Sequence, residues 1–396
     1  MKQSLSKGMM LISVILMDVL TGTEFDLFVP SFPELQSHFQ LTPFLVEALL
    51  SVNFIGFCLS LLFVGGLADR YGRKPILLMG LITFIIGSIL CVWTSSYELL
   101  LVGRFLQGLG IASPAILSFL IIADAYSLKK QQYLMGILNG LMNLSAGAAP
   151  VLGSYITLYF HWQGNFITLL SLGIATLVMT LVFIPTYKLP EQKETLSLRG
   201  YIPLFKSKPL MLLIMNIAIT CVPYWVFVGM SPLLYIKSLG VSLSHFGLYQ
   251  GALAFFFGLG SIVFGLIISR VDSKKMLKTS IYIGIMSLIC LAWITFVDSP
   301  NPLLITLAIL LFVLAQIVPS IILYPLCLNF IPQAKGRVSS IIQGTRLILS
   351  AFSLQIAAYY YQGSFQNIGI IIIGFIIIGI ISLFWVIRNR ELMRGM

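Results

Sequence analysis

Long apolar segments alternate with short polar ones along the whole chain. Each apolar segment has roughly the 20 residues that a helix needs to cross a bilayer, and the alternation typical of barrel strands is absent. The longest polar interval lies between the sixth and seventh segments. The pattern predicts an all-α polytopic membrane protein with two pseudo-symmetric bundles: an N-terminal six-helix bundle (1–185), a cytoplasmic linker (186–208) and a C-terminal six-helix bundle (209–396). The twelve predicted spans are at about residues 9–32, 43–65, 76–94, 97–122, 132–158, 164–184, 209–236, 243–268, 276–297, 302–328, 336–360 and 366–387.

Composition supports a membrane protein, because only 9% of the 396 residues are charged and 58% are apolar, whereas soluble proteins have about 25% charged residues. The net charge of +11 would fit a nucleic-acid partner. The basic residues fall instead in alternate short loops, as the positive-inside rule requires. We therefore expect no nucleic acid, a lipid bilayer as surroundings, and both termini on the cytoplasmic side of a bacterial inner membrane. The five cysteines lie in apolar runs without a CxxC pair, so neither a metal site nor a disulfide framework is indicated.

Three carboxylates, Asp18, Glu24 and Asp26, interrupt the first apolar segment. Acids at membrane depth are costly and usually face a bundle interior, where they bind protons, ions or cationic groups. On one continuous helix, Asp18 and Asp26 would lie roughly 12 Å apart along the axis and about 80° apart around it. Glu24 would point about 160° away from Asp26. We expect Asp18 and Asp26 to line one cavity, which Glu24 need not share.

Two arginines also lie deep inside predicted spans. Arg104 is roughly 10 Å from the outer end of its span, a depth similar to that of Asp26. An intramembrane arginine needs a partner, so Asp26 is a candidate, directly or through water, unless Arg104 extends outward to the interface. Arg346 lies near the midplane of the eleventh span. It could meet an anionic group of a substrate or pair with Asp18 across the two halves.

A glycine-rich basic loop, G-L-A-D-R-Y-G-R-K-P, joins the second and third spans. Glycines permit a tight turn, and an acid near a helix start gains from the helix dipole and from neighbouring arginines. The string resembles the signature loop of the major facilitator superfamily, and a degenerate echo occurs at 269–275, as a duplicated unit would predict. The resemblance implies a cytoplasmic latch between the two halves, made by Gly66, Asp69, Arg70, Gly72, Arg73 and Lys74.

Two further strings resemble motifs of this superfamily. The run R-F-L-Q-G from Arg104 is similar to its fourth-helix motif, which is associated with proton transfer. The fifth span resembles the glycine-rich motif of the superfamily's antiporters, with serines or alanine in place of some glycines. Small residues allow close helix packing, and proline leaves a deformable kink. The positions of this antiporter-type motif are Gly136, Ala149, Pro150 and Gly153.

Within the superfamily, the chain resembles the bicyclomycin-resistance (Bcr/CflA) drug:proton antiporters and the MdfA-type multidrug exporters. Those proteins share D-x-x-x-P in the first span, here Asp26 to Pro30, and the MdfA type has a second acid at the position of Asp18. Glu24 is an addition to that pattern. The resemblance implies a proton-coupling and substrate cavity built on Asp18, Asp26 and Arg104, with Glu24 as a further candidate; it does not supply Arg346.

These observations predict a secondary active transporter, working as a monomer without a cofactor, that exchanges protons for a small organic compound by alternating access. A proton-coupled importer of a nutrient or siderophore is the main alternative, which the imperfect fifth-helix motif and Arg346 favour. An enzyme is not expected, because no nucleophile–base group or nucleotide loop occurs. A sensor lacks an output domain, and a channel would not need a latch. We expect Asp18 to govern substrate choice and Asp26 to couple proton movement.

Overall fold

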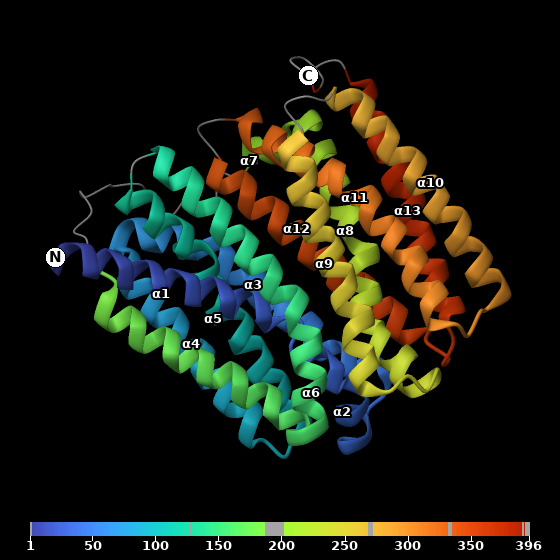
Figure 1. Cartoon of the computed structure of the whole chain (residues 1–396), viewed down its shortest axis with the longest axis horizontal. Coiled ribbons are helices and arrows are strands. Elements are labelled where there is room, and N and C mark those ends of the chain that lie inside the picture. The colour runs from blue at the N-terminus through green and yellow to red at the C-terminus, as the bar shows by residue number, and fades with distance from the viewer. Residues whose placement is uncertain are drawn as a thin grey trace. The chain divides into compact units, whose positions relative to one another are not determined.

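The computed structural model describes residues 2–126, 128–186, 202–267, 272–331, 335–389 and 392. Every regular element in these ranges is helical (Figure 1). Residues 187–201 of the predicted linker lie outside the described residues. The first half contains α1 (Lys2–Glu24), η1 (Val29–Ser31), α2 (Phe32–His38), α3 (Pro43–Tyr71), α4 (Arg73–Trp93), α5 (Tyr97–Ala125) and α6 (Leu128–Phe183). The second half contains α7 (Ile202–Lys206), α8 (Lys208–Pro232), η3 (Leu233–Ser238), α9 (Leu243–Ile267), α10 (Ser273–Val297), α11 (Pro302–Phe330), α12 (Lys335–Tyr359) and α13 (Phe365–Arg388).

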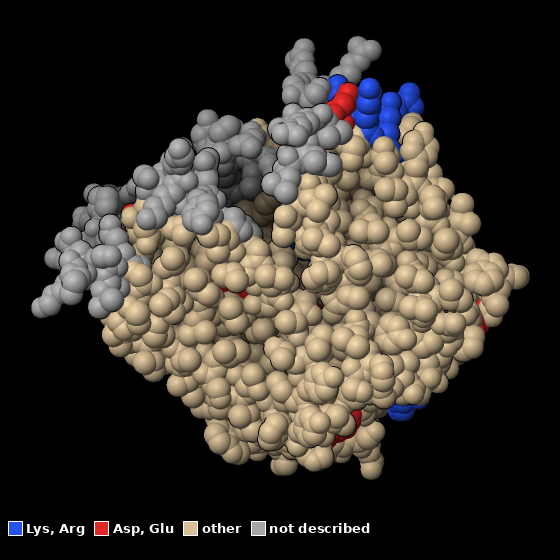
Figure 2. All heavy atoms as spheres, in the orientation of Figure 1, with Lys and Arg blue, Asp and Glu red and all other residues tan. Residues whose placement is uncertain are grey.

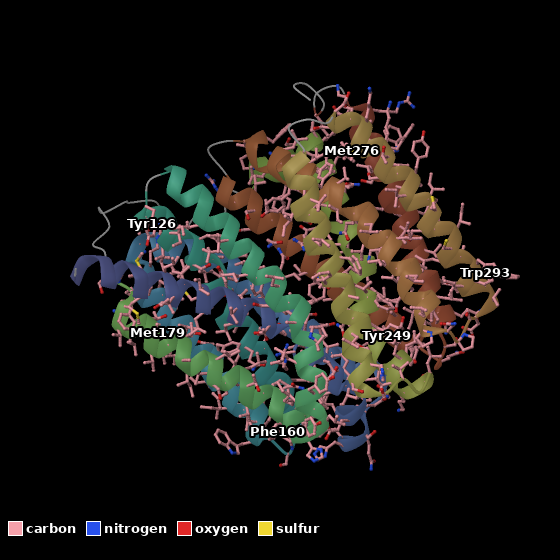
Figure 3. All side chains as sticks on the ribbon, viewed as in Figure 1. Tyr126, Phe160, Met179, Tyr249, Met276 and Trp293 are labelled. Atoms are coloured by element: carbon pink, nitrogen blue, oxygen red, sulfur yellow. The ribbon has the colours of Figure 1, made fainter. Side chains whose placement is uncertain are left out.

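The predicted twelve-span, all-α fold class is confirmed. Ten helices among the described residues are long and apolar enough to cross a membrane. One of them, α6, turns at His161 (φ 59°, ψ −176°), beside the labelled Phe160 in Figure 3, and therefore contains both the fifth and the sixth predicted spans. The first predicted span corresponds to α1. The helices of this fold present apolar side chains to their surroundings: Trp293 is 56% exposed and points outward from α10 in Figure 3.

One predicted helix boundary is wrong, and it changes the geometry of the candidate site. The first span was expected to continue to residue 32, but α1 ends at Glu24 and is followed by a turn, η1 and the short helix α2. Pro30 and Pro33 explain the break, because neither has an N–H to bond the carbonyl four residues earlier. Asp26 therefore lies in a turn, and the helical phase expected between it and Asp18 does not apply.

The chain divides into two compact units, residues 1–197 and 198–396. In the first unit, α5 packs against α3 and α4, and α1 packs against α6. In the second unit, α8 packs against α12 and α13, and α10 packs against α11 and α13. Figure 2 shows a surface almost without charge along the helices, while Lys and Arg gather where α10 begins. The apolar surface along the helices suits surrounding lipid.

Candidate functional site

A fully buried ion pair lies at the centre of the first unit. Arg104 on α5 approaches Glu24, the last residue of α1, with Nη1 2.9 Å from Oε1, and both side chains have no exposed surface. The predicted direct pairing of Arg104 with Asp26 is therefore wrong. That prediction matched depths along one continuous helix, whereas the chain turns after Glu24 and carries Asp26 away from the helix. Glu24, which was only a further candidate for the cavity, is the acid that neutralises Arg104.

Further hydrogen bonds hold the guanidinium of Arg104. Its Nη1 donates to Oε1 of Gln107 at 2.6 Å, and its Nε donates to the carbonyl of Leu49 at 3.3 Å. The ring of Phe28 lies beneath it, with 3.9 Å between the guanidinium carbon and the ring centroid, a cation–π contact. Gln107 in turn donates to Ser88 Oγ on α4 at 2.8 Å. These bonds support the pair on one side only, because Oε2 of Glu24 and Nη2 of Arg104 have no hydrogen-bond partner among the described residues.

Asn53 on α3 connects the two charged residues. Its Nδ2 donates to Glu24 Oε1 at 2.8 Å and to the backbone carbonyl of Arg104 at 3.0 Å. Gly108 makes this possible, because any side chain there would overlap the backbone of Asn53. No role was predicted for Asn53 or Ser88, although a polar residue inside an apolar span was the available signal.

The other two acids of the first segment have no such partners. Asp18 on α1 is fully buried, and neither of its carboxylate oxygens has a hydrogen-bond partner among the described residues. The hydroxyl of Ser118 on α5 lies near it without reaching hydrogen-bond geometry. Asp26 is 5% exposed, Oδ1 finds no partner in the described part of the chain, and the carboxylate is close enough to Glu24 for electrostatic repulsion. The site therefore combines one neutralised pair with two unpaired acids.

A fourth buried acid, Glu47 on α3, was not anticipated. It has no exposed surface, and both of its carboxylate oxygens lack a hydrogen-bond partner within the described ranges. An unpaired carboxyl in such surroundings is costly while it carries a charge. Its signal in the sequence was an acid within the first turns of an apolar span.

The antiporter-type motif packs against the turn that carries Asp26. Gly136, Ala149, Pro150 and Gly153 all lie on α6, which packs along α1 and η1. Gly153 lies so close to the turn that a Cβ there would overlap the carbonyl oxygen of Leu27, the residue after Asp26. Pro150 lies inside the helix one turn earlier. Gly153 therefore sets how closely α6 can approach the acid-bearing turn.

Gly153→Ala is expected to destabilise the protein by about 1–3 kcal/mol, because an added methyl group forces α6 away from the turn. Gly140→Ala on the same helix is the matched control, since nothing lies within 4 Å of its added Cβ. This control should be neutral or slightly stabilising, because alanine favours the helix. Melting of both variants in detergent is the measurement. Equal melting temperatures would contradict the proposed contact with the turn.

The basic loop is a one-residue turn between α3 and α4. Gly72 has φ 95°, a conformation that residues with a side chain rarely adopt, and Gly66 lies exposed on α3. Arg73 Nε lies 3.1 Å from Asp124 Oδ2 at the end of α5, and Lys74 Nζ donates to the carbonyl of Leu181 on α6 at 2.8 Å. These contacts tie the loop to two other helices of the first unit.

Two further residues of the predicted latch, Asp69 and Arg70, lie at the end of α3. The guanidinium of Arg70 lies over the ring of Tyr71, 5.3 Å from its centroid. Asp69 belongs to α3, but its side chain lies outside the described residues, so its predicted pairing with Arg70 or Arg73 stays a prediction.

Arg346 lies on α12 in the second unit, where it contacts Cys221 and Gln343. The structure thus places the predicted site residues in two groups. The first unit holds the acids and Arg104, and the second holds Arg346.

Residues 14–354 match the model of the Major Facilitator Superfamily, and the chain belongs to this family. The predicted family membership is thereby confirmed. Among curated proteins, the multidrug resistance protein MdtL of Escherichia coli strain SMS-3-5 is 35% identical over 156 residues. The aligned stretch covers 39% of this chain and 40% of that protein, so less than half of each is matched. MdtL of strain UTI89 gives the same identity and coverage.

Solved structures agree on the fold. The nucleoside transporter NupG has a TM-score of 0.77 at 14% identity, and the match covers 97% of this chain and 100% of that one. A D-xylose-proton symporter has a TM-score of 0.74, also at 14% identity, with 95% and 96% covered. At such low identity these likenesses describe the fold alone.

Proposed function

We propose that this protein is a proton-coupled efflux antiporter, which exports a small organic compound in exchange for protons by alternating access. The observation that supports this proposal best is the contrast inside the first unit: Glu24 already neutralises Arg104, while Asp18 and Asp26 are buried without an ion-pair partner among the described residues. The multidrug relatives support export of organic compounds, and their partial coverage leaves the substrate range open.

The proposed coupling follows from the charges around Asp26. Binding one proton removes an unpaired negative charge from the membrane interior and ends its repulsion with Glu24. Binding of a compound near the acids would favour release of that proton, because the compound and the proton both change the charge around Asp26. Buried acids that lie close to other charged groups are typical sites of such proton exchange.

We assign substrate choice to Asp18, which is fully buried within α1, and proton coupling to Asp26, which lies in the turn after the helix. The latch loop would act when the two units rock between inward- and outward-facing states. We propose a monomer in a bacterial inner membrane, with both termini cytoplasmic and no cofactor, whose partners are protons, a small-molecule substrate and the lipid bilayer.

Reconstituted protein in liposomes tests the direction of coupling. A panel of labelled compounds is first screened for reduced accumulation in cells that make the protein. Each hit is then assayed in proteoliposomes with the pH gradient imposed in either direction. An antiporter moves its compound toward the compartment with more protons. A symporter moves it away from that compartment, and this outcome would replace export with the importer alternative.

A further inference from the structure

The guanidinium of Arg346 is held in an unusual way. On α12, its Nε and Nη2 both donate to the single sulfur atom of Cys221 on α8, at 3.3 and 3.2 Å. Its Nη1 donates to Oε1 of Gln343 at 2.7 Å. Two converging N–H groups are the fork that normally binds the two oxygens of a carboxylate or phosphate. Here the fork meets one thiol, which is only a weak acceptor.

Arg346 also has no acidic partner among the described residues of the second unit. The acids of that unit are Asp272, Asp298 and Glu391. Asp272 caps the start of α10, and Asp298 lies at its other end, where it accepts from the backbone N–H of Gln366. Glu391 lies outside the described residues. Arg346 is roughly 16 Å along α12 from its first residue, near the middle of the helix.

The two intramembrane arginines therefore differ in kind. Arg104 has no exposed surface and is fully neutralised by Glu24. Arg346 keeps partial exposure and has no acidic partner among the described residues of its own unit. A charged side chain at membrane depth normally pairs with an opposite charge or faces a polar path. Arg346 thus has the properties of a group that can bind an anion.

We infer that Arg346, Cys221 and Gln343 form a binding position for an anionic group of the transported compound: a carboxylate, sulfonate or phosphate. The assignment of this anion as cargo rests on the proposed transport function, whereas anion binding itself does not. An entering anion would take the two N–H groups that now point at the sulfur. Tyr324, whose hydroxyl is 3.0 Å from Ser339 Oγ, lies near enough to act on Arg346 electrostatically and adds a polar wall.

Cys221 provides a direct probe of this position. In a protein that keeps only this cysteine, its sulfur attacks the sulfenyl sulfur of a methanethiosulfonate reagent, forms a mixed disulfide and releases methanesulfinate. The other cysteines to be replaced by alanine are Cys58, Cys91, Cys290 and Cys327. Two reagents of similar size are compared, one with a sulfonatoethyl group and one with a trimethylammonium-ethyl group. Each rate is divided by the rate of the same reagent with 2-mercaptoethanol.

The normalised rate of the anionic reagent should exceed that of the cationic one by at least ~10-fold, because a nearby guanidinium attracts the sulfonate. Arg346→Gln should reduce the ratio to about 1, and Arg346→Lys should keep most of it. The matched control is Arg388→Gln, which removes the same charge from an exposed helix end and should leave the ratio unchanged. A ratio that Arg346→Gln does not alter would overturn the proposal.

Equilibrium dialysis of labelled naphthalene-2-sulfonate provides a second measurement that does not depend on access to the thiol. Purified protein in detergent should bind it at least ~10-fold more tightly than the Arg346→Gln variant does, and 2-naphthol, which lacks the sulfonate, should show no difference. Equal binding of the sulfonate by both proteins would also refute the site.

A competition experiment identifies the source of the anion. Competition by organic sulfonates but not by inorganic phosphate supports an organic cargo. Equal competition by phosphate would overturn the cargo assignment. None of these measurements requires transport, so they remain decisive if the reconstituted protein moves no compound.

Discussion

Arg104→Gln is expected to destabilise the protein by about 3–5 kcal/mol, because it leaves the carboxylate of Glu24 buried without its counter-charge. Glu24→Gln should have a similar cost, since it leaves the guanidinium unpaired in the same dry surroundings. The expected melting temperatures of both variants in detergent are therefore far below that of the unaltered protein. Neither side chain has exposed surface through which water could compensate the loss.

A double variant distinguishes pairing of Arg104 with Glu24 from pairing with Asp26. Combining Glu24→Gln with Arg104→Gln replaces the ion pair with two neutral amides, so its destabilisation should be smaller than the sum of the single effects by at least ~2 kcal/mol. The matched cycle combines Asp26→Asn with Arg104→Gln and should give a clearly smaller coupling energy, because Asp26 acts on Arg104 only through the charge of Glu24. Coupling to Asp26 together with additivity for Glu24 would reassign the partner of Arg104.

Asp26→Asn is expected to abolish uphill transport of every substrate while binding stays measurable, because the amide can neither take up nor release a proton. The measurement is substrate-induced proton release from detergent-solubilised protein, paired with direct binding of the same compound. Asp18→Asn is the comparison variant. It should still release protons but change the preference among compounds, with cationic ones losing most because the attracting charge is gone.

Other outcomes of that experiment reassign the roles. Proton release that persists in the Asp26 variant and disappears in the Asp18 variant would exchange the functions of the two acids. Release that persists in both would show that neither is the sole coupling residue. Glu24 would then be tested next. Glu47 would be tested with it, because it is buried and neither of its carboxylate oxygens has a hydrogen-bond partner among the described residues.

The spans could be predicted because helix length in a bilayer is set by thickness and hydropathy, which are local properties of the sequence. The partner of Arg104 could not, because it depends on where α1 ends. Pro30 and Pro33 are present in the sequence, but matching depths along one continuous helix favours Asp26 over Glu24, whereas α1 ends at Glu24. The need of a buried arginine for an acid was predictable, while the choice between acids two residues apart was not.

The contacts of Asn53, Gln107 and Ser88 could not be predicted from the sequence either. They join helices that only the tertiary fold brings together. Gly108 belongs to a recognisable motif, but its role as the point where α5 meets the backbone of Asn53 depends on the packing of a second helix. Polar residues in apolar spans show that a network exists, and three-dimensional packing decides its connections.

The positive charge of Arg346 has a consequence for how membrane voltage would act on the transport cycle. Outward movement of a monovalent anion in exchange for one inward-moving proton shifts two elementary charges in the same electrical direction. At 100 mV, negative inside, this movement releases about 4.6 kcal/mol, since each charge contributes about 2.3 kcal/mol. For a cation exchanged for one proton, the two electrical contributions cancel. With an anion bound at Arg346, the membrane potential alone would therefore drive export, even where no pH difference exists across the membrane.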